Sequence, residues 1–434
     1  MILSKTLRNF VVTIQFLFLG VLSFGQHIAT PSSIHNQIQE KTDEIFEQLV
    51  NIRNDFYTHP EPSGNEKRTS QKIAEHLQSL GLEVKTDIGG HGVVGILSTG
   101  KKGKHISWRA DIDALPAHIH EKTGHPSTNK KASHVCGHDV NTTVALGIAN
   151  VLTSIKSQLT GTISFIFQPA EETYKGAKAM IDDGLFELIS PDEIYGAHLA
   201  PMETTMIATK PEWLFADYKT IKVSFRNSEE NDAIIAFSKK IISTLQNVAP
   251  DDKFWNPKSI SDPTIGLANP NTIFTNYRFV NPKSFEVTKT DKVISIEAYI
   301  GASDATLLTN AIQEVTSKIR ISKFAKHLID VSFSYERATV NNDTLLTQKS
   351  LASIAQRYGA ENIIRLYGEM PDYRGDDFAY FQQHVPGVYF YLGGSNFAKG
   401  IISMPHIPSF SVDLNCIRTG VNYFSSMIID RLAE

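Results

Sequence analysis

The sequence has 434 residues, of which 41% are hydrophobic and 20% are charged, and its formal net charge at neutral pH is −4. This composition is typical of a globular protein that folds and is long enough for two domains with their own cores. The charge balance, without any basic run interleaved with aromatic residues, argues against a nucleic-acid partner.

The first 25 residues predict an export signal peptide. Lys5 and Arg8 precede the apolar stretch 10–22, and residues 23–25 (Ser-Phe-Gly) form a small-x-small cleavage pattern before Gln26. A membrane anchor is the alternative, but the stretch is shorter than the roughly 20 residues needed to span a bilayer, and no charged stop follows it. We therefore expect a mature chain that is exported, to the periplasm or the medium, and that keeps no membrane span.

From residue 30 to residue 200, helical and strand-like patterns alternate. Apolar spacing predicts helices over 30–60, 73–80, 144–152 and 176–188, and strands over 82–86, 92–97, 105–108, 162–167 and 193–195. This alternation predicts an α/β domain whose sheet is mixed but mostly parallel and is flanked by helices.

Between residues 217 and 334 the pattern changes. It predicts strands over 220–225, 272–279 and 293–300 and helices over 233–245 and 305–319, which we interpret as a smaller α+β insertion of βαββαβ type. The insertion has few clustered titratable groups, so we expect a lid or dimerisation domain. The α/β pattern then resumes with a helix over 345–358, a strand over 387–392 and a helix over 420–432. We therefore predict a catalytic domain made of residues 26–216 and 335–434.

Polar clusters follow three of the predicted strands. Residues 109–116 follow the strand 105–108, Glu171 and Glu172 follow the strand 162–167, and His198 follows the strand 193–195. Ligands bind at the carboxyl edge of open α/β sheets, so this placement indicates a site.

Five side chains in four segments have the chemistry of metal ligands. One thiol, three imidazoles and one carboxylate come from Cys136, His138, Glu172, His198 and His406. A single histidine is more often a structural residue, and paired glutamates are usually solvated, but the joint occurrence predicts a metal centre. Five ligands exceed the four of a tetrahedral ion, so we expect two ions with a carboxylate or water between them.

The chain has two cysteines, Cys136 and Cys416. A disulfide between them is one interpretation for an exported protein. The Gly-His-Asp context of Cys136 favours a thiolate ligand instead, which leaves Cys416 as a small buried residue.

Glu171, beside the predicted ligand Glu172, is the candidate general base. A carboxylate at this position can accept the proton of a metal-activated water and return it to the leaving group. The alternative role for Glu171 is to accept a hydrogen bond from one of the metal-binding side chains and so orient it. Asp111, Asp113 and Asp139 are expected to orient the histidines.

Seven motifs together resemble the dinuclear metal amidohydrolase family, which includes hippurate hydrolases, auxin-conjugate hydrolases and related aminoacylases and carboxypeptidases. They are 59–63 (His-Pro-Glu-Pro-Ser), 109–116, 136–139 (Cys-Gly-His-Asp), 168–172 (Gln-Pro-Ala-Glu-Glu), 176–186, 196–198 (Gly-Ala-His) and 377–381 (Asp-Phe-Ala-Tyr-Phe). The resemblance implies a catalytic domain interrupted by a lid that often forms a homodimer.

The resemblance also implies a function. Cys136, His138, Glu172, His198 and His406 would bind two divalent metal ions, manganese or zinc, and Glu171 would be the catalytic acid/base. The implied substrate is a small N-acyl amino acid or peptide that is hydrolysed at its amide bond.

The inserted domain departs from this family. Relatives carry a Gly-Gly-His segment whose histidine contacts substrate, whereas residues 225–232 contain no histidine, and the family's Asn-Val-Ile-Pro and Gly-Thr-x-Arg stretches are replaced at 276–279 and 298–301. Three outcomes follow: a different substrate bound by Arg226 or Arg278, a low activity, or a metal-binding protein that does not hydrolyse its ligand. Because all six metal and base positions are intact, we expect a working hydrolase.

Overall fold

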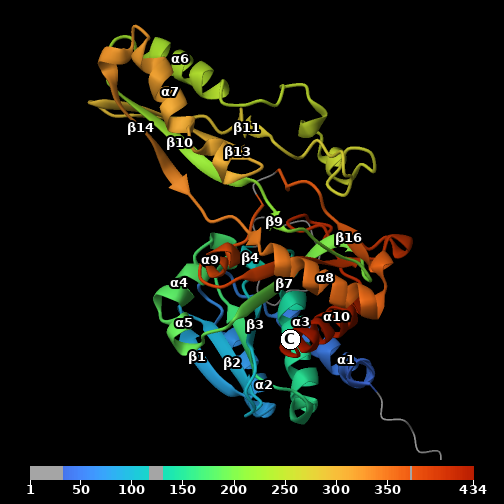
Figure 1. Cartoon of the computed structure of the whole chain (residues 1–434). Coiled ribbons are helices and arrows are strands. Elements are labelled where there is room, and N and C mark those ends of the chain that lie inside the picture. The colour runs from blue at the N-terminus through green and yellow to red at the C-terminus, as the bar shows by residue number, and fades with distance from the viewer. Residues whose placement is uncertain (1–32, 117–130, 372–373) are drawn as a thin grey trace, which may run out of the picture.

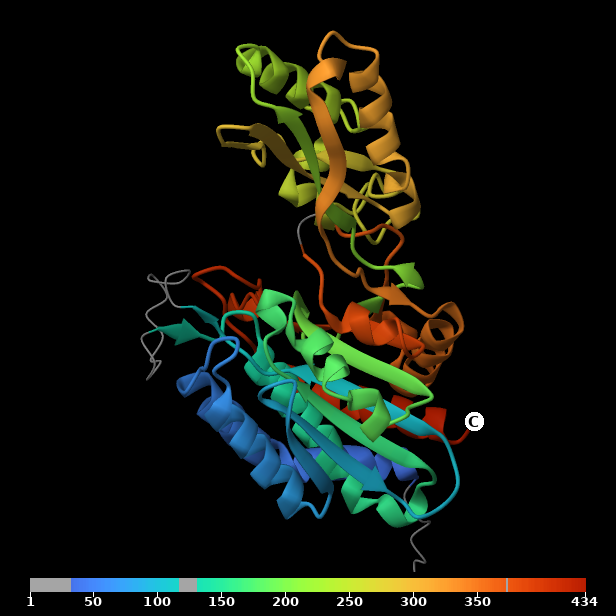
Figure 2. The ribbon, with the colours of Figure 1, turned by 90° about the vertical axis from the view of Figure 1, so that its left-hand side faces the viewer.

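The computed structural model describes residues 33–116, 131–371 and 374–434, so the predicted export signal lies outside the described residues. The chain forms two sheet-based parts, one standing above the other in Figures 1 and 2. Among the helices of the described ranges, none has the length and apolar character required to cross a bilayer.

The larger part is built on an eight-stranded sheet of order β1-β2-β6-β3-β7-β17-β8-β16. Its strands are β1 (Glu83–Ile88), β2 (Gly92–Ser98), β3 (His105–Asp111), β6 (Thr162–Gln168), β7 (Glu193–Glu203), β8 (Ile207–Thr209), β16 (Ile363–Arg365) and β17 (Gly387–Ser395). Of the seven neighbouring pairs described in this sheet, four are parallel. The prediction of a mixed, mostly parallel sheet is confirmed.

Helices cover both faces of this sheet. On one face lie α1 (Ile34–Thr58), α2 (Lys67–Ser79), α3 (His138–Ser154), α8 (Thr344–Tyr358) and α10 (Asn415–Leu432), and on the other α4 (Gly176–Asp182), α5 (Leu185–Leu188) and α9 (Phe378–Gln382). The helix predicted over 176–188 is divided, because Gly184 has a φ of +88°. The last helix begins five residues before the predicted 420. Two short antiparallel ladders, β4 (Leu115–Pro116) with β5 (Ala132–Ser133) and β9 (Glu212–Trp213) with β15 (Asn341–Asn342), lie off the main sheet.

The smaller part is an antiparallel sheet of order β11-β13-β10-β14, with β12 also paired to β13. Its elements are β10 (Asp217–Arg226), α6 (Asn231–Ser243), β11 (Arg278–Val280), β12 (Glu286–Lys289), β13 (Val293–Ala302), α7 (Ala311–Arg320) and β14 (Leu328–Glu336). Both helices share one hydrophobic cluster with the sheet. The predicted α+β class of the insertion is confirmed, with β12 as an additional strand.

The strand predicted over 272–279 was wrong for most of its length. Only Arg278–Val280 forms a strand. The alternation of apolar residues there has another cause, because Phe274 and Tyr277 are buried in an aromatic cluster with Phe254. Burial in a turn-rich segment produced the same pattern as a strand.

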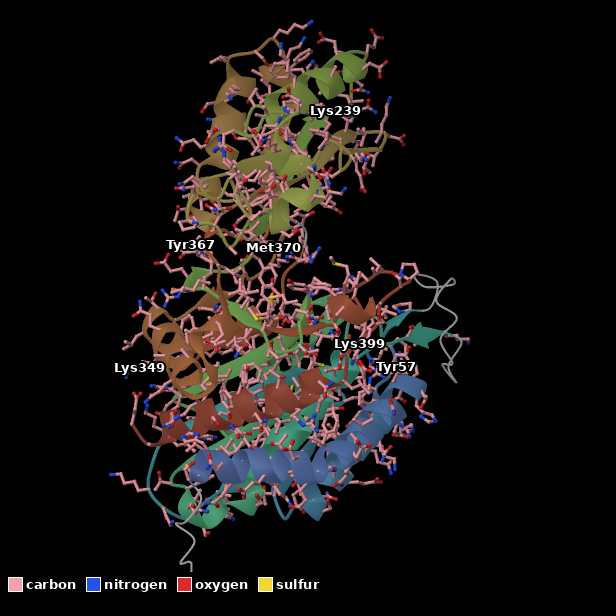
Figure 3. The ribbon with its side chains drawn as sticks, turned by 90° about the vertical axis from the view of Figure 1, so that its right-hand side faces the viewer. Tyr57, Lys239, Lys349, Tyr367, Met370 and Lys399 are labelled. Carbon is pink, nitrogen blue, oxygen red and sulfur yellow. The ribbon has the colours of Figure 1, made fainter. Side chains whose placement is uncertain are left out.

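This aromatic segment joins the two parts. Tyr367 N donates to Leu267 O at 2.7 Å and Glu369 N donates to Phe274 O at 2.9 Å. Figure 3 shows Tyr367 and Met370 at the junction. A Cβ on Gly368 would lie 2.9 Å from the Phe274 Cβ, so the close contact requires glycine. The segment from 265 to 277 therefore fastens the smaller sheet to residues 366–370.

Candidate metal centre

The candidate ligands come from segments at one edge of the large sheet. His138 opens α3, and Gly137 before it has a φ of +97° and no room for a Cβ, which would lie 2.9 Å from Leu199 Cδ2. Glu171 and Glu172 lie in a 3-10 turn (Glu171–Thr173) directly after β6. His198 lies inside β7, so the expectation that its strand stops at 195 was wrong.

The structure brings all five predicted ligands together. Cys136 Sγ lies 3.3 Å from His198 Nε2 and 3.1 Å from His406 Nε2, and His406 Nε2 lies 3.3 Å from Glu172 Oε1. Among the described residues, four groups of three have ligand atoms that all lie within 4.8 Å of one another. Two triads consist of predicted ligands alone: Cys136, His138 and His198, and Cys136, Glu172 and His406. Cys136 belongs to both triads. The other two groups contain Glu171.

Hydrogen bonds orient two of the imidazoles. His138 Nδ1 lies 2.9 Å from Asp113 O, and His198 Nδ1 lies 2.7 Å from Leu199 O. Because a carbonyl only accepts, each Nδ1 carries the proton and each Nε2 keeps its lone pair for a metal. His138 Nε2 is buried with no hydrogen-bond partner among the described residues. These residues therefore fit a divalent ion.

The electrostatic field at the ligands favours a cation. Burial would lower the pKa of His138, but Asp111, Asp113 and Glu172 raise it to about 10. Burial, and then the charges of Glu172 and Glu171, raise the pKa of the Cys136 thiol well above its usual range. A bound metal ion reverses this situation, since it deprotonates a coordinating thiol.

The two adjacent glutamates have opposite pKa shifts. Burial, and then Asp376 and Glu172, raise the pKa of Glu171 well above its usual value. The pKa of Glu172 is lowered, because the hydrogen bond with His406 and the charge of His138 outweigh its burial. Carboxyl groups whose pKa values are driven apart are typical of an acid/base residue beside a permanently charged one.

A buried ionic network behind Glu171 was missed by the sequence reasoning. Arg109 is fully buried, its Nη1 donates to Asp111 Oδ2 at 2.8 Å, and its Nη2 lies 3.0 Å from Asp376 Oδ1 and 3.2 Å from Asp377 Oδ1. Carboxylate oxygens of Asp376 and Asp377 lie within 4.8 Å of one on Glu171. The sequence evidence for these residues was that Arg109 and residues 377–381 belong to family motifs. Their contact with one another is visible only in the fold.

Three expectations for other residues need correction. Within the described ranges, the contact found for the Asp139 carboxylate is with Arg53 and not with a predicted ligand: its Oδ2 lies 2.7 Å from Arg53 Nε. Arg278 binds Glu314 at 2.8 Å, and Arg226 donates to the Lys326 carbonyl, so neither of these contacts reaches the ligand cluster.

Cys136 and Cys416 are both buried free thiols, so the disulfide interpretation is excluded and Cys416 is the small buried residue that was expected.

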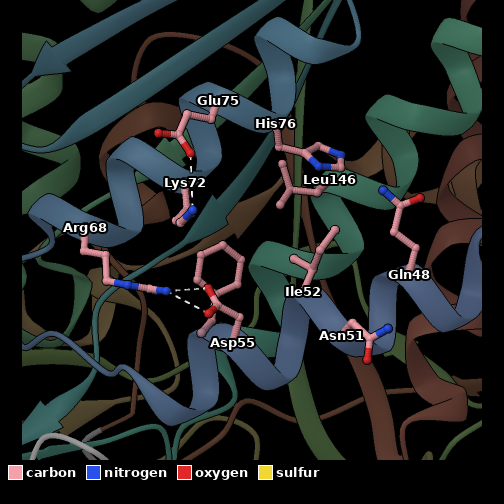
Figure 4. A pocket seen from close by; sticks show the side chains of 10 residues that line it. Gln48, Asn51, Ile52, Asp55, Arg68, Lys72, Glu75, His76 and Leu146 are labelled. Carbon is pink, nitrogen blue, oxygen red and sulfur yellow. Dashed lines mark hydrogen bonds and ion pairs between the residues drawn. The ribbon is translucent and has the colours of Figure 1, made fainter.

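A separate hollow of about 680 Å³ lies between α1 and α2 (Figure 4). Apolar side chains such as Ile52 and Leu146 line it together with Arg68, which is hydrogen-bonded to Asp55. None of its lining residues belongs to the ligand triads. The hollow is therefore distinct from the candidate metal centre.

Comparisons with known proteins agree with this arrangement. YhaA of Bacillus subtilis (strain 168), which bears the name of an amidohydrolase, is 28% identical over 421 residues, covering 92% of this chain and 98% of YhaA. The IAA-amino acid hydrolase ILR1-like 5 of Arabidopsis thaliana is 27% identical over 89% of this chain and 87% of its own length. The crystal structure of YXEP of Bacillus subtilis, described as a dinuclear metal-binding peptidase, has the same fold, with a TM-score of 0.69 at 24% identity over 90% of this chain and 99% of that one.

A family model also matches residues 108–430, which hold every candidate ligand and Glu171. The chain therefore belongs to peptidase family M20/M25/M40 and is a hydrolase of amide or peptide bonds.

Proposed function

We propose that the protein is a two-metal amidohydrolase that cleaves the amide bond of N-acyl amino acids or small peptides. The observation that carries this proposal is the pair of ligand triads that share Cys136, with Glu171 beside them. The relatives named for amidohydrolase and amino acid conjugate hydrolase activity support the substrate class.

Cys136, His138 and His198 would hold one ion, and Cys136, Glu172 and His406 the other. In this arrangement the Cys136 thiolate would be common to both ligand sets, and the carboxylate or water expected between the ions stays a prediction. Thiolate and imidazole ligands suit zinc, and manganese is the second candidate. Two such ions would polarise the scissile carbonyl and lower the pKa of a water molecule to about 7.

Glu171 would perform the proton transfers. Its buried carboxyl lies within 3.7 Å of His138 Nε2, at the face of the triads. In this position it can take a proton from the attacking water and deliver it to the leaving amine nitrogen. The Arg109 network with Asp376 and Asp377 lies directly behind it and would hold its surroundings rigid.

A substrate screen tests this function. Metal-reconstituted protein would be assayed on N-acyl amino acids and dipeptides, with Glu171→Gln as the background. We expect at least one class to be cleaved far above that background. Metal binding without cleavage of any amide would instead support the binding-protein alternative, which the absence of a histidine at 225–232 favours.

Two further expectations belong to this proposal. Export through the signal at residues 1–25 predicts a mature N-terminus near Gln26, which N-terminal sequencing of the secreted protein checks.

A homodimer through the smaller domain would use the edge strand β14, where Ile329 and Tyr335 are 48% and 44% exposed. Light scattering of the wild type and of Ile329→Lys would then give a dimer and a monomer respectively.

A further inference from the structure

The residue before Glu171 has a backbone conformation that is uncommon for an amino acid with a side chain. Ala170 has a φ of +52° and a ψ of +36°, in the left-handed region, and it begins the turn that carries Glu171 and Glu172. Its carbonyl accepts hydrogen bonds from Lys175 N at 3.3 Å and Gly176 N at 3.2 Å. The turn therefore closes on Ala170, and the backbone of this residue sets the direction of the Glu171 side chain.

A carboxyl group from a distant segment holds the amide of Ala170. Glu66, which directly precedes α2, is 0% exposed, and its Oε1 accepts hydrogen bonds from Ala170 N at 2.8 Å and Gly64 N at 2.9 Å. A left-handed residue other than glycine is strained and persists only when its surroundings hold it. The hydrogen bond from Ala170 N to Glu66 supplies such a hold from outside the turn.

The residue after Glu171 is held separately. Glu172 N donates to Asp113 Oδ2 at 3.1 Å, and the same oxygen accepts a hydrogen bond from Ser63 Oγ at 2.6 Å. Ser63 and Glu66 belong to one loop before α2, so this loop fixes the backbone on both sides of Glu171. Loss of the Glu66 carboxyl would release the side before Glu171 and leave the link between the predicted metal ligand and Asp113.

We propose that Glu66 is a positioning residue, which fixes the conformation of Ala170 and thereby holds the Glu171 carboxyl in the orientation that its proton transfers require. This inference rests on the proposed amidohydrolase function and adds to it a residue that acts through backbone amides. Proton transfer depends on geometry first, and a displacement of about 1 Å can cost about 100-fold in rate. Burial raises the pKa of the Glu66 carboxyl, so glutamine, which is neutral and keeps the accepting oxygen, is a close substitute for it.

The test measures kcat and KM of metal-loaded Glu66→Met, Glu66→Gln and Glu61→Met on the N-acyl amino acid or dipeptide that wild type cleaves fastest. Glu61→Met is the matched control, because the Glu61 carboxylate accepts N–H groups inside α2, from Arg68 at 3.1 Å and Thr69 at 2.8 Å. Glu66→Met should lower kcat about 10- to 100-fold, with two ions retained and KM within a few-fold of wild type. Glu66→Gln and Glu61→Met should both keep kcat within a few-fold of wild type.

Thermal unfolding and metal content show whether each variant is folded and loaded. If Glu66→Met does not fold, Glu66→Asp takes its place, because the shorter side chain keeps the carboxyl group and places its oxygens farther from Ala170 N. The same loss of kcat is expected for it. An equal loss of kcat in Glu61→Met, a loss in Glu66→Gln as large as in Glu66→Met, or a wild-type kcat in Glu66→Met would overturn the proposal.

Hydrogen exchange separates this inference from the proposed function. If wild type cleaves none of these amides, the proposed function fails, and exchange of the Ala170 amide still decides the role of Glu66. Mass spectrometry of peptides that cover residues 168–176 measures this exchange. Faster exchange in Glu66→Met than in Glu61→Met supports the positioning role, and equal exchange refutes it.

Discussion

Replacement of Cys136 with serine exchanges one sulfur atom for oxygen and thereby changes a ligand in both triads. Cys136 Sγ lies 3.3 Å from His198 Nε2 and 3.1 Å from His406 Nε2, and no other residue belongs to both triads among the described residues. The side chain is 7% exposed, and serine has nearly the same shape. The direct cost to the metal-free protein should therefore stay below about 1.5 kcal/mol.

The effect on metal-linked stability should be larger. A metal ion at one hundred times its Kd stabilises a folded protein by about 2.7 kcal/mol per site. If loss of the thiolate weakens binding about 100-fold, the same metal concentration stabilises the variant by only about 0.4 kcal/mol. We thus expect the variant to lose about 2 kcal/mol of metal-dependent stability at each of the two triads.

Urea unfolding with and without zinc or manganese measures this difference. Cys416→Ser is the matched control, because Cys416 is a fully buried free thiol in α10, outside the triads. The control should keep the metal-linked stabilisation of wild type. If Cys136→Ser keeps it as well, or if Cys416→Ser loses it, the assignment of Cys136 as the shared ligand is incorrect.

Two further predictions concern stability. Burial lowers the pKa of His134 from 6.5 to about 4, so the unfolded chain binds more protons than the folded chain between these pH values, and stability falls as the pH is lowered through this window. Metal-free wild type should lose on the order of 3 kcal/mol of unfolding free energy between pH 6.5 and 4, and His134→Gln should not show this loss. Urea unfolding at several pH values measures it, and an equal pH dependence of the unfolding free energy in both proteins would refute the prediction. Gly368→Val should destabilise by about 1–3 kcal/mol, because its Cβ would crowd Phe274. In a double-mutant cycle Phe274→Gly, which removes the crowded Cβ, should relieve part of this cost, and strict additivity would argue against the contact.

Local sequence patterns predicted much of the fold for a physical reason. The apolar positions of α1, such as Ile38, Ile45 and Leu49, repeat at helical spacing because one face of the helix packs on α3 and α10. The same logic failed at Phe274 and Tyr277, since alternation records burial and an irregular segment can bury alternate residues as a strand does. Periodicity reports which residues are covered and leaves the backbone conformation open.

The site was predictable where its residues stand in short motifs. Cys136 and His138 are two residues apart, and Glu171 and Glu172 are adjacent, so their chemistry is visible locally. The ion pair of Arg109 with Asp376 joins residues 267 positions apart and left no local signal. The role first considered for Arg278 failed for the same reason, because its partner Glu314 is distant in the sequence. Pairing between distant charges requires the fold.

The most direct test of the two-metal mechanism measures metal content and amide hydrolysis together for wild type and Glu171→Gln. We expect both proteins to bind two ions, because Glu171 belongs to neither of the triads that share Cys136. Only wild type should hydrolyse the amide, with a loss of at least about 100-fold in the variant, since general acid–base catalysis contributes about 10²–10⁴-fold. A variant that binds two ions and keeps a rate close to that of wild type would show that Glu171 is not the acid/base residue.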